Sequence, residues 1–249
     1  MFSVNIALLG YGKMGKEIEQ IALQRGHTIV LKIDETNLDQ LTVENLKRAD
    51  VAIEFSTPKT VLGNIELCFQ AGTPIVVGTT GWYEHFEDVK TKCNTENHSL
   101  FHATNFSIGV NITFYINQLL AKIMNGFAEY DVVMEEIHHL QKLDHPSGTA
   151  ITLAEGIIDN LQRKTKWQGW LNDGTEEKPI NTPDGLLIEA LREEGIPGTH
   201  TVSYISDIDR IDLKHTAFNR KGFATGAVVA AEWIVSRKGV FTMKDMLSF

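Results

Sequence analysis

The stretch VNIALLGYGKMG, residues 4–15, decides the fold of this chain. Its apolar first half predicts a buried strand, and its second half, Gly10-Tyr11-Gly12-Lys13-Met14-Gly15, is a glycine turn that leads into apolar residues at helical spacing. Glycine suits these places because the backbone must turn tightly, approach a pyrophosphate and let the helix pack on the strand. A tight turn without a ligand is the alternative. The candidate residues of the dinucleotide site are Gly10, Gly12, Lys13, Met14 and Gly15.

An acidic residue follows the next predicted strand, over residues 28–33. Asp34 stands about 20 residues beyond the glycine turn, where a carboxylate accepts hydrogen bonds from the ribose hydroxyls of adenosine. A surface acid after a plain turn is the alternative. Because the turn and the acid occur together, Asp34 is the candidate residue for the ribose.

Two later turns also follow apolar runs, at residues 78–81 and 103–106. Ligands of open α/β sheets bind outside the carboxyl ends of the strands, so these turns are expected to reach the same cofactor. Ordinary turn chemistry is the alternative. The candidate cofactor-binding residues here are Gly78, Thr79, Thr80, Ala103, Thr104, Asn105 and Phe106.

The order of strands and helices predicts two domains. The first 105 residues alternate strand and helix, which is typical of a parallel sheet covered by helices. Later come a helix near 149–163 and strand candidates near 131–137, 185–192, 199–206 and 208–216, which favour an α+β domain with antiparallel pairing. An apolar helix over 224–234 could return to the first domain. The expected class is α/β, with a Rossmann-type dinucleotide-binding domain of residues 1–106 plus 220–249 and an α+β domain of residues 107–219.

Composition excludes several functions. The formal charge is −9, with 23 Lys and Arg against 32 Asp and Glu, so there is no electrostatic footprint for nucleic acid. The apolar runs are shorter than a membrane span, and the first residues lack the basic start of a secretion signal. Cys68 and Cys93 fit neither a zinc nor a redox spacing. A cytoplasmic protein that meets neither membrane nor nucleic acid is expected.

The densest chemistry lies between residues 136 and 149. Residues 138–145 contain three histidines, a lysine and an aspartate, which could donate a proton or hold a carboxylate. Pro146-Ser147-Gly148-Thr149 is typical of a helix start, where an anion meets open N–H groups. A well-capped helix after a polar loop is the alternative. No metal is expected, because no thiolate or outlying His/Glu pair completes a zinc ligand set.

The segment Glu136 to Thr149 reads E-x-H-H-x-x-K-x-D-x-P-S-G-T and closely resembles the signature of the 4-hydroxy-tetrahydrodipicolinate reductase (dihydrodipicolinate reductase) family. The resemblance covers nearly the whole chain. Its other parts are residues 10–15, Phe55-Ser56-x-Pro58, residues 78–81, Asn105-Phe106-Ser107-x-Gly109-Val110, Gly198-x-His200, His215, Arg220 and Phe223-Ala224-x-Gly226-Ala227.

The resemblance implies a reaction and a role for each matching residue. His138 is expected to donate or accept the proton, with Lys142 as its partner, while His139, Gly148 and Thr149 bind the carboxylates of a small dicarboxylate substrate. The first domain is expected to hold NADH or NADPH for the reduction of 4-hydroxy-tetrahydrodipicolinate to tetrahydrodipicolinate, in the diaminopimelate route of lysine biosynthesis. The second domain is expected to bind the substrate and to build a homotetramer.

Two departures from the family pattern concern the cofactor. The glycine turn is one residue shorter than the common family form, and Glu35 and Thr36 follow Asp34 where many relatives carry arginine. Negative charge beside the ribose disfavours a 2′-phosphate, so NADH is expected to be used at least as well as NADPH. Lys13 is the one obvious compensating cation.

Two other functions compete with this interpretation. Another two-domain nicotinamide-dependent dehydrogenase acting on a small carboxylate would share the first domain, but the segment 136–149 argues against it. A nucleotide-sensing regulator would use the same fold without catalysis. A DNA-binding version of it is disfavoured by the lack of a basic patch.

Overall fold

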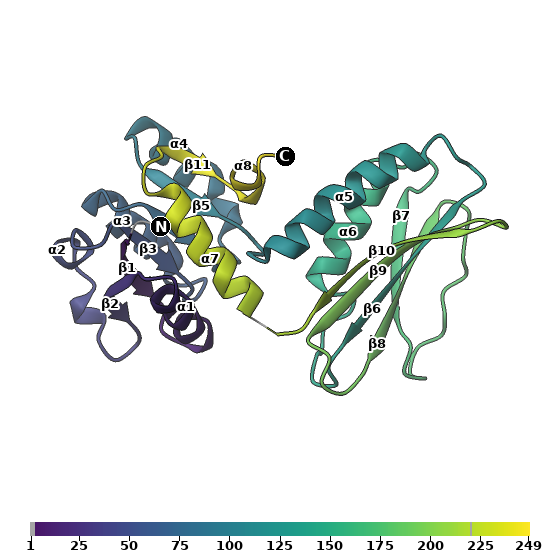
Figure 1. Ribbon diagram of the computed structural model, residues 1–249, viewed down its shortest axis with the longest axis horizontal. Coiled ribbons are helices and arrows are strands. Elements are labelled where there is room, and N and C mark those ends of the chain that lie inside the picture. Colours follow the sequence, from purple (N-terminus) through teal and green to yellow (C-terminus); the bar gives the residue numbers. More distant parts are fainter. Residues whose placement is uncertain (1–2, 220) are drawn as a thin grey trace. The chain divides into compact units, whose positions relative to one another are not determined.

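The computed structural model describes residues 3–219 and 221–249 and divides into two compact units (Figure 1). The first unit joins the residues up to Ile108 to the segment Lys221–Phe249, and the second begins at Gly109. The chain thus leaves the first unit and returns to it, at 108/109 and 220/221, where the sequence placed the boundaries at 106/107 and 219/220. Arg220, one of the residues that match the family pattern, lies outside the described residues.

The first unit contains a six-stranded sheet in which every pairing is parallel. The predicted parallel sheet is confirmed. The order β11-β5-β4-β3-β1-β2 brings the carboxyl ends of the strands to one edge, where a ligand would bind. The strands are β1 (Asn5–Leu9), β2 (Thr28–Ile33), β3 (Val51–Glu54), β4 (Ile75–Val77), β5 (Ser99–His102) and β11 (Gly239–Phe241).

Helices cover both faces of this sheet, and for that reason its strands are almost continuously apolar. Ile6 and Leu8 of β1 belong to a core that includes residues of α1 and α7, whereas Ala7 and Leu9 belong to a core with α3 and α4. The helices are α1 (Lys13–Gln24), α2 (Val43–Leu46), α3 (Val61–Ala71), α4 (Phe86–Thr95), α7 (Lys221–Ile234) and α8 (Met243–Leu247), with 3-10 turns η1 (Leu38–Gln40) and η2 (Tyr83–His85). Both cysteines are buried and free, and burial raises the pKa of the Cys68 and Cys93 thiols, the latter to about 11.

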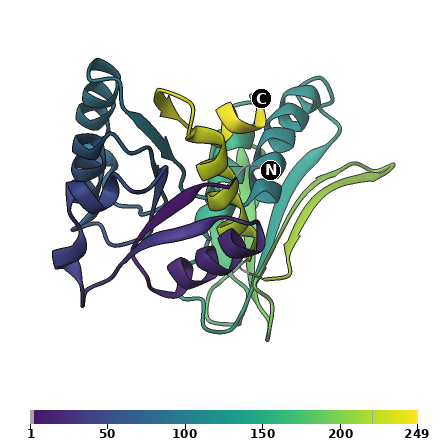
Figure 2. The same ribbon diagram turned by 60° about the vertical axis from the view of Figure 1, so that its left-hand side comes forward.

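The second unit is a five-stranded sheet with two helices along one face (Figures 1 and 2). Its order is β10-β9-β6-β8-β7. Val132 and Met134 of β6, with Val202 and Tyr204 of β9, share a core with residues of α5 and α6. The elements are α5 (Ile108–Met124), β6 (Asp131–His138), α6 (Gly148–Ile158), β7 (Lys166–Leu171), β8 (Gly185–Arg192), β9 (Gly198–Ile205) and β10 (Arg210–Ala217).

The expected antiparallel pairing is confirmed for only part of this sheet, and one of its strands was not expected. The pairing is mixed, because β8 runs parallel to both β6 and β7, and only the pairs that involve β9 are antiparallel. Lys166–Leu171, which is not among the strand candidates named from the sequence, forms the edge strand β7. Parallel neighbours need a long connection, which α6 and the segment 172–184 provide. An edge strand with lysine, glutamine and glycine carries too weak an alternation to be recognised in the sequence.

No helix within residues 3–219 and 221–249 combines the length and the apolar character that crossing a membrane requires.

Candidate active site

The predicted glycine turn joins β1 to α1, and its backbone tolerates no side chain at two places. Gly10 has φ +97°, and a Cβ there would lie 2.1 Å from the Phe55 carbonyl oxygen. A Cβ at Gly15 would lie 2.3 Å from the Gly10 carbonyl oxygen. Gly12 is the N-cap of α1 and no side chain caps that helix, so its first N–H groups face an incoming anion.

A cavity of about 520 Å³ opens beside this turn, in the size range of ligand sites. It lies at the carboxyl ends of β1, β2 and β3, next to the point where the strand order reverses, the usual dinucleotide position. Its lining residues are Gly10, Tyr11, Gly12, Ile33, Asp34, Glu35, Thr36, Leu38, Phe55, Ser56, Thr57, Thr60 and Asn64.

Asp34 is ordered within this cavity as a hydrogen-bond acceptor. Its Oδ1 accepts hydrogen bonds from the Thr36 N–H at 2.8 Å and the Thr36 hydroxyl at 2.6 Å. The Thr36 hydroxyl, followed by its backbone N–H, lowers the pKa of the Asp34 carboxyl. An ionised carboxylate at this place suits the two hydroxyls of a ribose.

The other predicted cofactor residues do not line the cavity. Lys13 is exposed at the start of α1, with Met14 half-buried beside it. The Thr79 hydroxyl accepts a hydrogen bond from the Ser56 N–H at 2.8 Å, and a Cβ at Gly78 would collide with the Phe55 ring. Phe106 is a core residue, whereas Thr80 is exposed and Ala103, Thr104 and Asn105 lie in the turn before it.

Sequence reasoning gave no role to the hydroxyl-rich turn after β3. Ser56, Thr57, Thr60 and Asn64 line the cavity, and the buried carboxylate of Glu54 accepts hydrogen bonds from Ser56 and, at 3.2 Å, from Asn64. Burial raises the pKa of Glu54 despite these hydrogen bonds. Phe55-Ser56-x-Pro58 ends an apolar strand as residues 78–81 do, and that signal could have identified it.

The second unit gathers ionisable residues at the end of β6. Burial alternates along this strand, so that Glu136 and His138 point to the face covered by the helices, as Val132 and Met134 do. His200 lies directly opposite Glu136 in the antiparallel pairing with β9. Glu136 Oε2 lies 3.7 Å from His138 Nδ1 and 3.6 Å from His200 Nε2. The sequence predicted a role for His138 but gave none to Glu136 and His200, which were named only as parts of the family pattern.

Burial governs the ionisation of His138. It lowers the pKa of the imidazole to about 4, while the Glu136 carboxylate opposes the shift and the charges of His200, Lys142 and Arg192 add to it. Burial also acts to raise the pKa of Glu136, but His200 and Ser147 outweigh it and leave that pKa below the usual range. In the unliganded protein near neutral pH, the ring is neutral and the carboxyl is charged.

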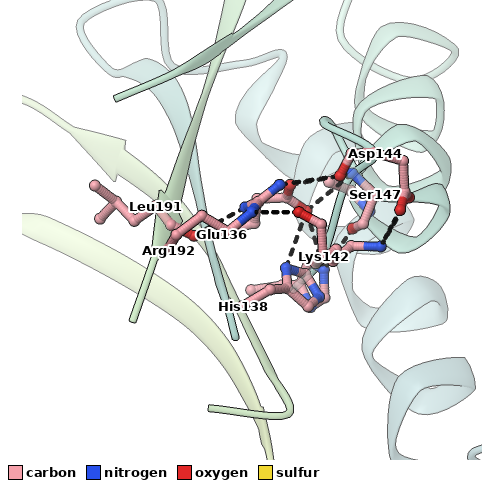
Figure 3. Close-up of polar contacts among 9 residues, drawn as sticks. Glu136, His138, Lys142, Asp144, Ser147, Leu191 and Arg192 are labelled. Carbon is pink, nitrogen blue, oxygen red and sulfur yellow. Dashed lines mark hydrogen bonds and ion pairs between the residues drawn. The ribbon is translucent and has the colours of Figure 1, made fainter. Parts of the chain in front are cut away.

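Lys142 lies on the loop that follows β6, in a defined position (Figure 3). Its Nζ donates to both carboxylate oxygens of Asp144, at 2.8 and 2.7 Å. Arg192, at the end of β8, donates from Nε to the Lys142 carbonyl and from its NH2 nitrogen to the Asp144 carbonyl, each at 3.0 Å. The guanidinium therefore fixes the backbone that carries the predicted lysine.

The predicted carboxylate-binding residues lie around the start of α6. Ser147 is the N-cap, and its Oγ accepts from the Ala150 N–H at 3.2 Å. Gly148 and Thr149 are the first two helical residues, where backbone N–H groups and the positive end of the helix attract an anion. His139 follows His138 directly, and its Nδ1 is buried without a hydrogen-bond partner among the described residues.

Three buried donors of the kind that bind metal ions meet here. Donor atoms of Glu136, His138 and His200 all lie within 4.8 Å of one another. Two histidines and a glutamate form one of the known catalytic zinc sets. The sequence argument against a metal assumed that no residue from a distant part of the sequence joins the cluster. His200 of β9 does join it.

Comparison with known proteins matches the whole chain to one family. The family model "Dihydrodipicolinate reductase, N-terminus" matches residues 4–106, and "Dihydrodipicolinate reductase, C-terminus" matches residues 109–247. A 4-hydroxy-tetrahydrodipicolinate reductase of Christiangramia forsetii is 49% identical over 245 residues, covering 98% of both chains. One from Acinetobacter baumannii is 33% identical, covering 97% of this chain and 95% of the relative.

A solved structure shares the fold. Dipicolinate-bound dihydrodipicolinate reductase from Paenisporosarcina sp. TG-14 superposes with a TM-score of 0.78 at 24% identity, covering 97% of this chain and 98% of the other.

Proposed function

The chain belongs to the dihydrodipicolinate reductase family, and on that premise we propose that it reduces 4-hydroxy-tetrahydrodipicolinate to tetrahydrodipicolinate with NADH or NADPH. The observation that carries this proposal is the cluster at the end of β6. A buried imidazole, an ammonium group and a helix N-terminus come together there, as a dicarboxylate that must be protonated requires. The enzyme is expected to act in the cytoplasm, in the diaminopimelate route of lysine biosynthesis.

The two units divide the chemistry. The cofactor, when bound beside Gly10, Gly12 and Asp34, supplies a hydride to the ring as water is lost. The residues around the start of α6, His139, Gly148 and Thr149, hold the substrate carboxylates. His138 gives a proton to the ring as electron density builds up, and the Lys142 ammonium stabilises that density once water is excluded.

The low pKa of His138 in the unliganded protein is consistent with this role. A proton donor must be charged before it gives up its proton, and a ring with a pKa of about 4 is neutral near pH 7. A bound dicarboxylate adds negative charge close to the ring, which raises the pKa of the imidazole. The donor is therefore charged chiefly when its substrate is present.

We also infer that NADH is used at least as well as NADPH. Asp34 and Glu35 both line the cavity and oppose the charge of a 2′-phosphate. A neighbouring cavity that shares Asp34 contains Lys32 and Arg48, but the Lys32 ammonium is bound to Glu19 at 3.2 Å. Arg48 of that cavity and Lys16, whose charge acts on Asp34, are thus the cations near the proposed ribose site that a 2′-phosphate could reach.

A homotetramer formed through residues 108–218 is the proposed assembly. Helices cover one face of the five-stranded sheet, and β10 and β7 lie at its edges. Ile205, Ile208 and Ile211 are exposed where β9 turns into β10. Open edges and exposed apolar side chains favour pairing between subunits.

The test of the function is direct. The purified protein is mixed with the fresh condensation product of pyruvate and aspartate semialdehyde, and NADH absorbance is followed. We expect the absorbance to fall only when protein and both condensation partners are present. A protein that binds NADH yet leaves its absorbance unchanged would be a nucleotide sensor instead.

A further inference from the structure

We propose that Glu136 is the positioning residue of the active site: its carboxylate orients His138 through Nδ1 and ties that ring to the substrate-binding start of α6 through Ser147 and His200. The proposal rests on the function proposed above and assigns a role within it to three residues, Glu136, Ser147 and His200.

The first observation is that one carboxylate serves two elements. Glu136 is fully buried, and both of its oxygens accept from the Ser147 N–H, at 3.1 and 3.0 Å. The same Ser147 caps α6. The carboxylate therefore fixes where the helix begins, and with it the N–H groups that face the substrate.

The second observation is an unpaired atom that faces this carboxylate. His138 Nδ1 is buried and has no hydrogen-bond partner within residues 3–219 and 221–249, and Glu136 Oε2 lies 3.7 Å away. That distance is too long for a hydrogen bond, and a shift of about 0.7 Å would close it. Catalytic hydrogen bonds are often long in unliganded enzymes and shorten when the substrate binds.

The third observation concerns the other ring nitrogen. A Cβ at Gly198 would lie only 3.0 Å from His138 Nε2, so the ring packs closely against this residue and glycine is the residue that fits there. With Nδ1–H directed at Glu136, the charged ring gives its proton from Nε2. The neutral ring that remains keeps its proton on Nδ1, where the carboxylate stabilises it.

His200 completes the link from a second strand. Its Nε2 lies 2.9 Å from Ser147 Oγ and 3.6 Å from Glu136 Oε2. Its ring packs edge-on against the His138 ring, with centroids 5.1 Å apart. Glu136 and His200 thus contact the imidazole from β6 and β9, and Ser147 at the start of α6 holds both of them in place.

The decisive experiment compares Glu136→Gln with wild type. Glutamine keeps the size of the side chain and can still accept from Ser147, but it carries no charge and turns its amide N–H groups toward His138. Nitrogen NMR of the His138 ring near neutral pH should show the Nδ1–H form in wild type and a shift toward the Nε2–H form in E136Q. This measurement needs no turnover, so it stands even if the reductase assay fails.

The kinetic expectation has a defined sign. Glu136 raises the pKa of His138, while His200, Lys142 and Arg192 lower it and His215 lies beyond His200 on β10. Removing the negative charge of Glu136 lowers the pKa of His138, so the His138 ring loses its proton at a lower pH. The limb of the kcat profile that falls with rising pH should move to lower pH, and kcat should drop about tenfold or more. KM and NADH affinity should stay within about twofold.

Glu135→Gln is the matched control, because Glu135 is the next residue on β6 and points to the other face of the sheet. It should leave kcat, the pH profile and the ring form unchanged. Glu136→Asp keeps the negative charge, so the pH dependence of kcat should stay as in wild type. Because its side chain is shorter and positions the His138 ring less well, kcat itself should be reduced.

Three results overturn the proposal. The first is that E136Q keeps the Nδ1–H form of His138 and the wild-type pH dependence of kcat, whatever its kcat value. The second is wild-type kcat in E136D, which also decides the matter if E136Q does not fold. The third is loss of wild-type activity with EDTA and its return with zinc, since Glu136 would then be a metal ligand.

Discussion

At the scale of single residues, His138 and Lys142 should control turnover and leave the cofactor alone. Replacing His138 by Gln or Lys142 by Ala should lower kcat by about 10²-fold or more, because a positioned acid contributes roughly 10²–10⁴-fold. NADH affinity, measured by fluorescence, should stay near wild type because the proposed nucleotide-binding residues lie in the other unit. His145→Gln, on the same loop but paired with Glu176, is the control. Near-wild-type turnover in both variants would end the assignment.

Asp34 should show the opposite behaviour. Asp34→Ala should weaken NADH binding with less effect on kcat, because its ionised carboxylate is expected to hold the ribose and not the reacting ring. Asp39→Ala, an exposed acid of η1 that does not line the cavity, should change neither. In wild type, kcat/KM should be at least as high with NADH as with NADPH. A tenfold preference for NADPH would contradict this.

The residues that the sequence missed share one property. Glu136 and His200 are adjacent only because β6 and β9 pair antiparallel in one register, and nothing local to either segment encodes that register. His138 and Lys142 could be proposed from the sequence because they lie in one short, dense segment. Thr79 and Phe106 follow strands β4 and β5, as the sequence predicted, but a turn pattern does not tell a side chain that lines a cavity from one that packs behind its wall.

At the scale of elements, the N-cap of α6 should matter for both stability and substrate binding. Ser147→Ala removes the hydroxyl that caps the helix and meets His200, so it should cost about 1 kcal/mol of unfolding free energy. KM for the substrate should rise several-fold. Thr42→Ala removes an equivalent cap from α2, where Thr42 Oγ1 accepts from Asn45, and should leave KM unchanged. Denaturant unfolding and steady-state kinetics measure the two effects, and equal KM values in both variants would exclude the role.

Helices and strands with strong sequence patterns were predicted correctly, and those with weak patterns were missed. The strand, turn and helix of residues 4–24 combine a run buried on both faces, glycines and helical periodicity, so β1 and α1 were predicted in the right places. β7 was missed because an edge strand needs little apolar surface. The parallel pairings of β8 depend on how α6 and the segment 172–184 carry the chain back, which no local pattern reveals.

At the scale of the whole molecule, the chain should assemble as a tetramer through its second unit. Light scattering should give about four times the chain mass of 27.8 kDa. Ile208→Asp, at the exposed turn between β9 and β10, should reduce the assembly because it buries a charge in the expected contact. Leu23→Asp, on an exposed position of α1 in the first unit, should not. A stable monomer at working concentration would refute the assembly.

The return of the chain to its first unit has a consequence during protein synthesis. The ribosome delivers α7 and α8 after the second unit, yet residues of both belong to the same core as Ile6 and Leu8, which are made before that unit. The second unit can fold while one face of the emerging parallel sheet still has no cover, and uncovered apolar surface of this kind invites aggregation. A nascent chain that stops after the second unit would therefore carry a folded second unit together with a first unit that lacks α7 and α8.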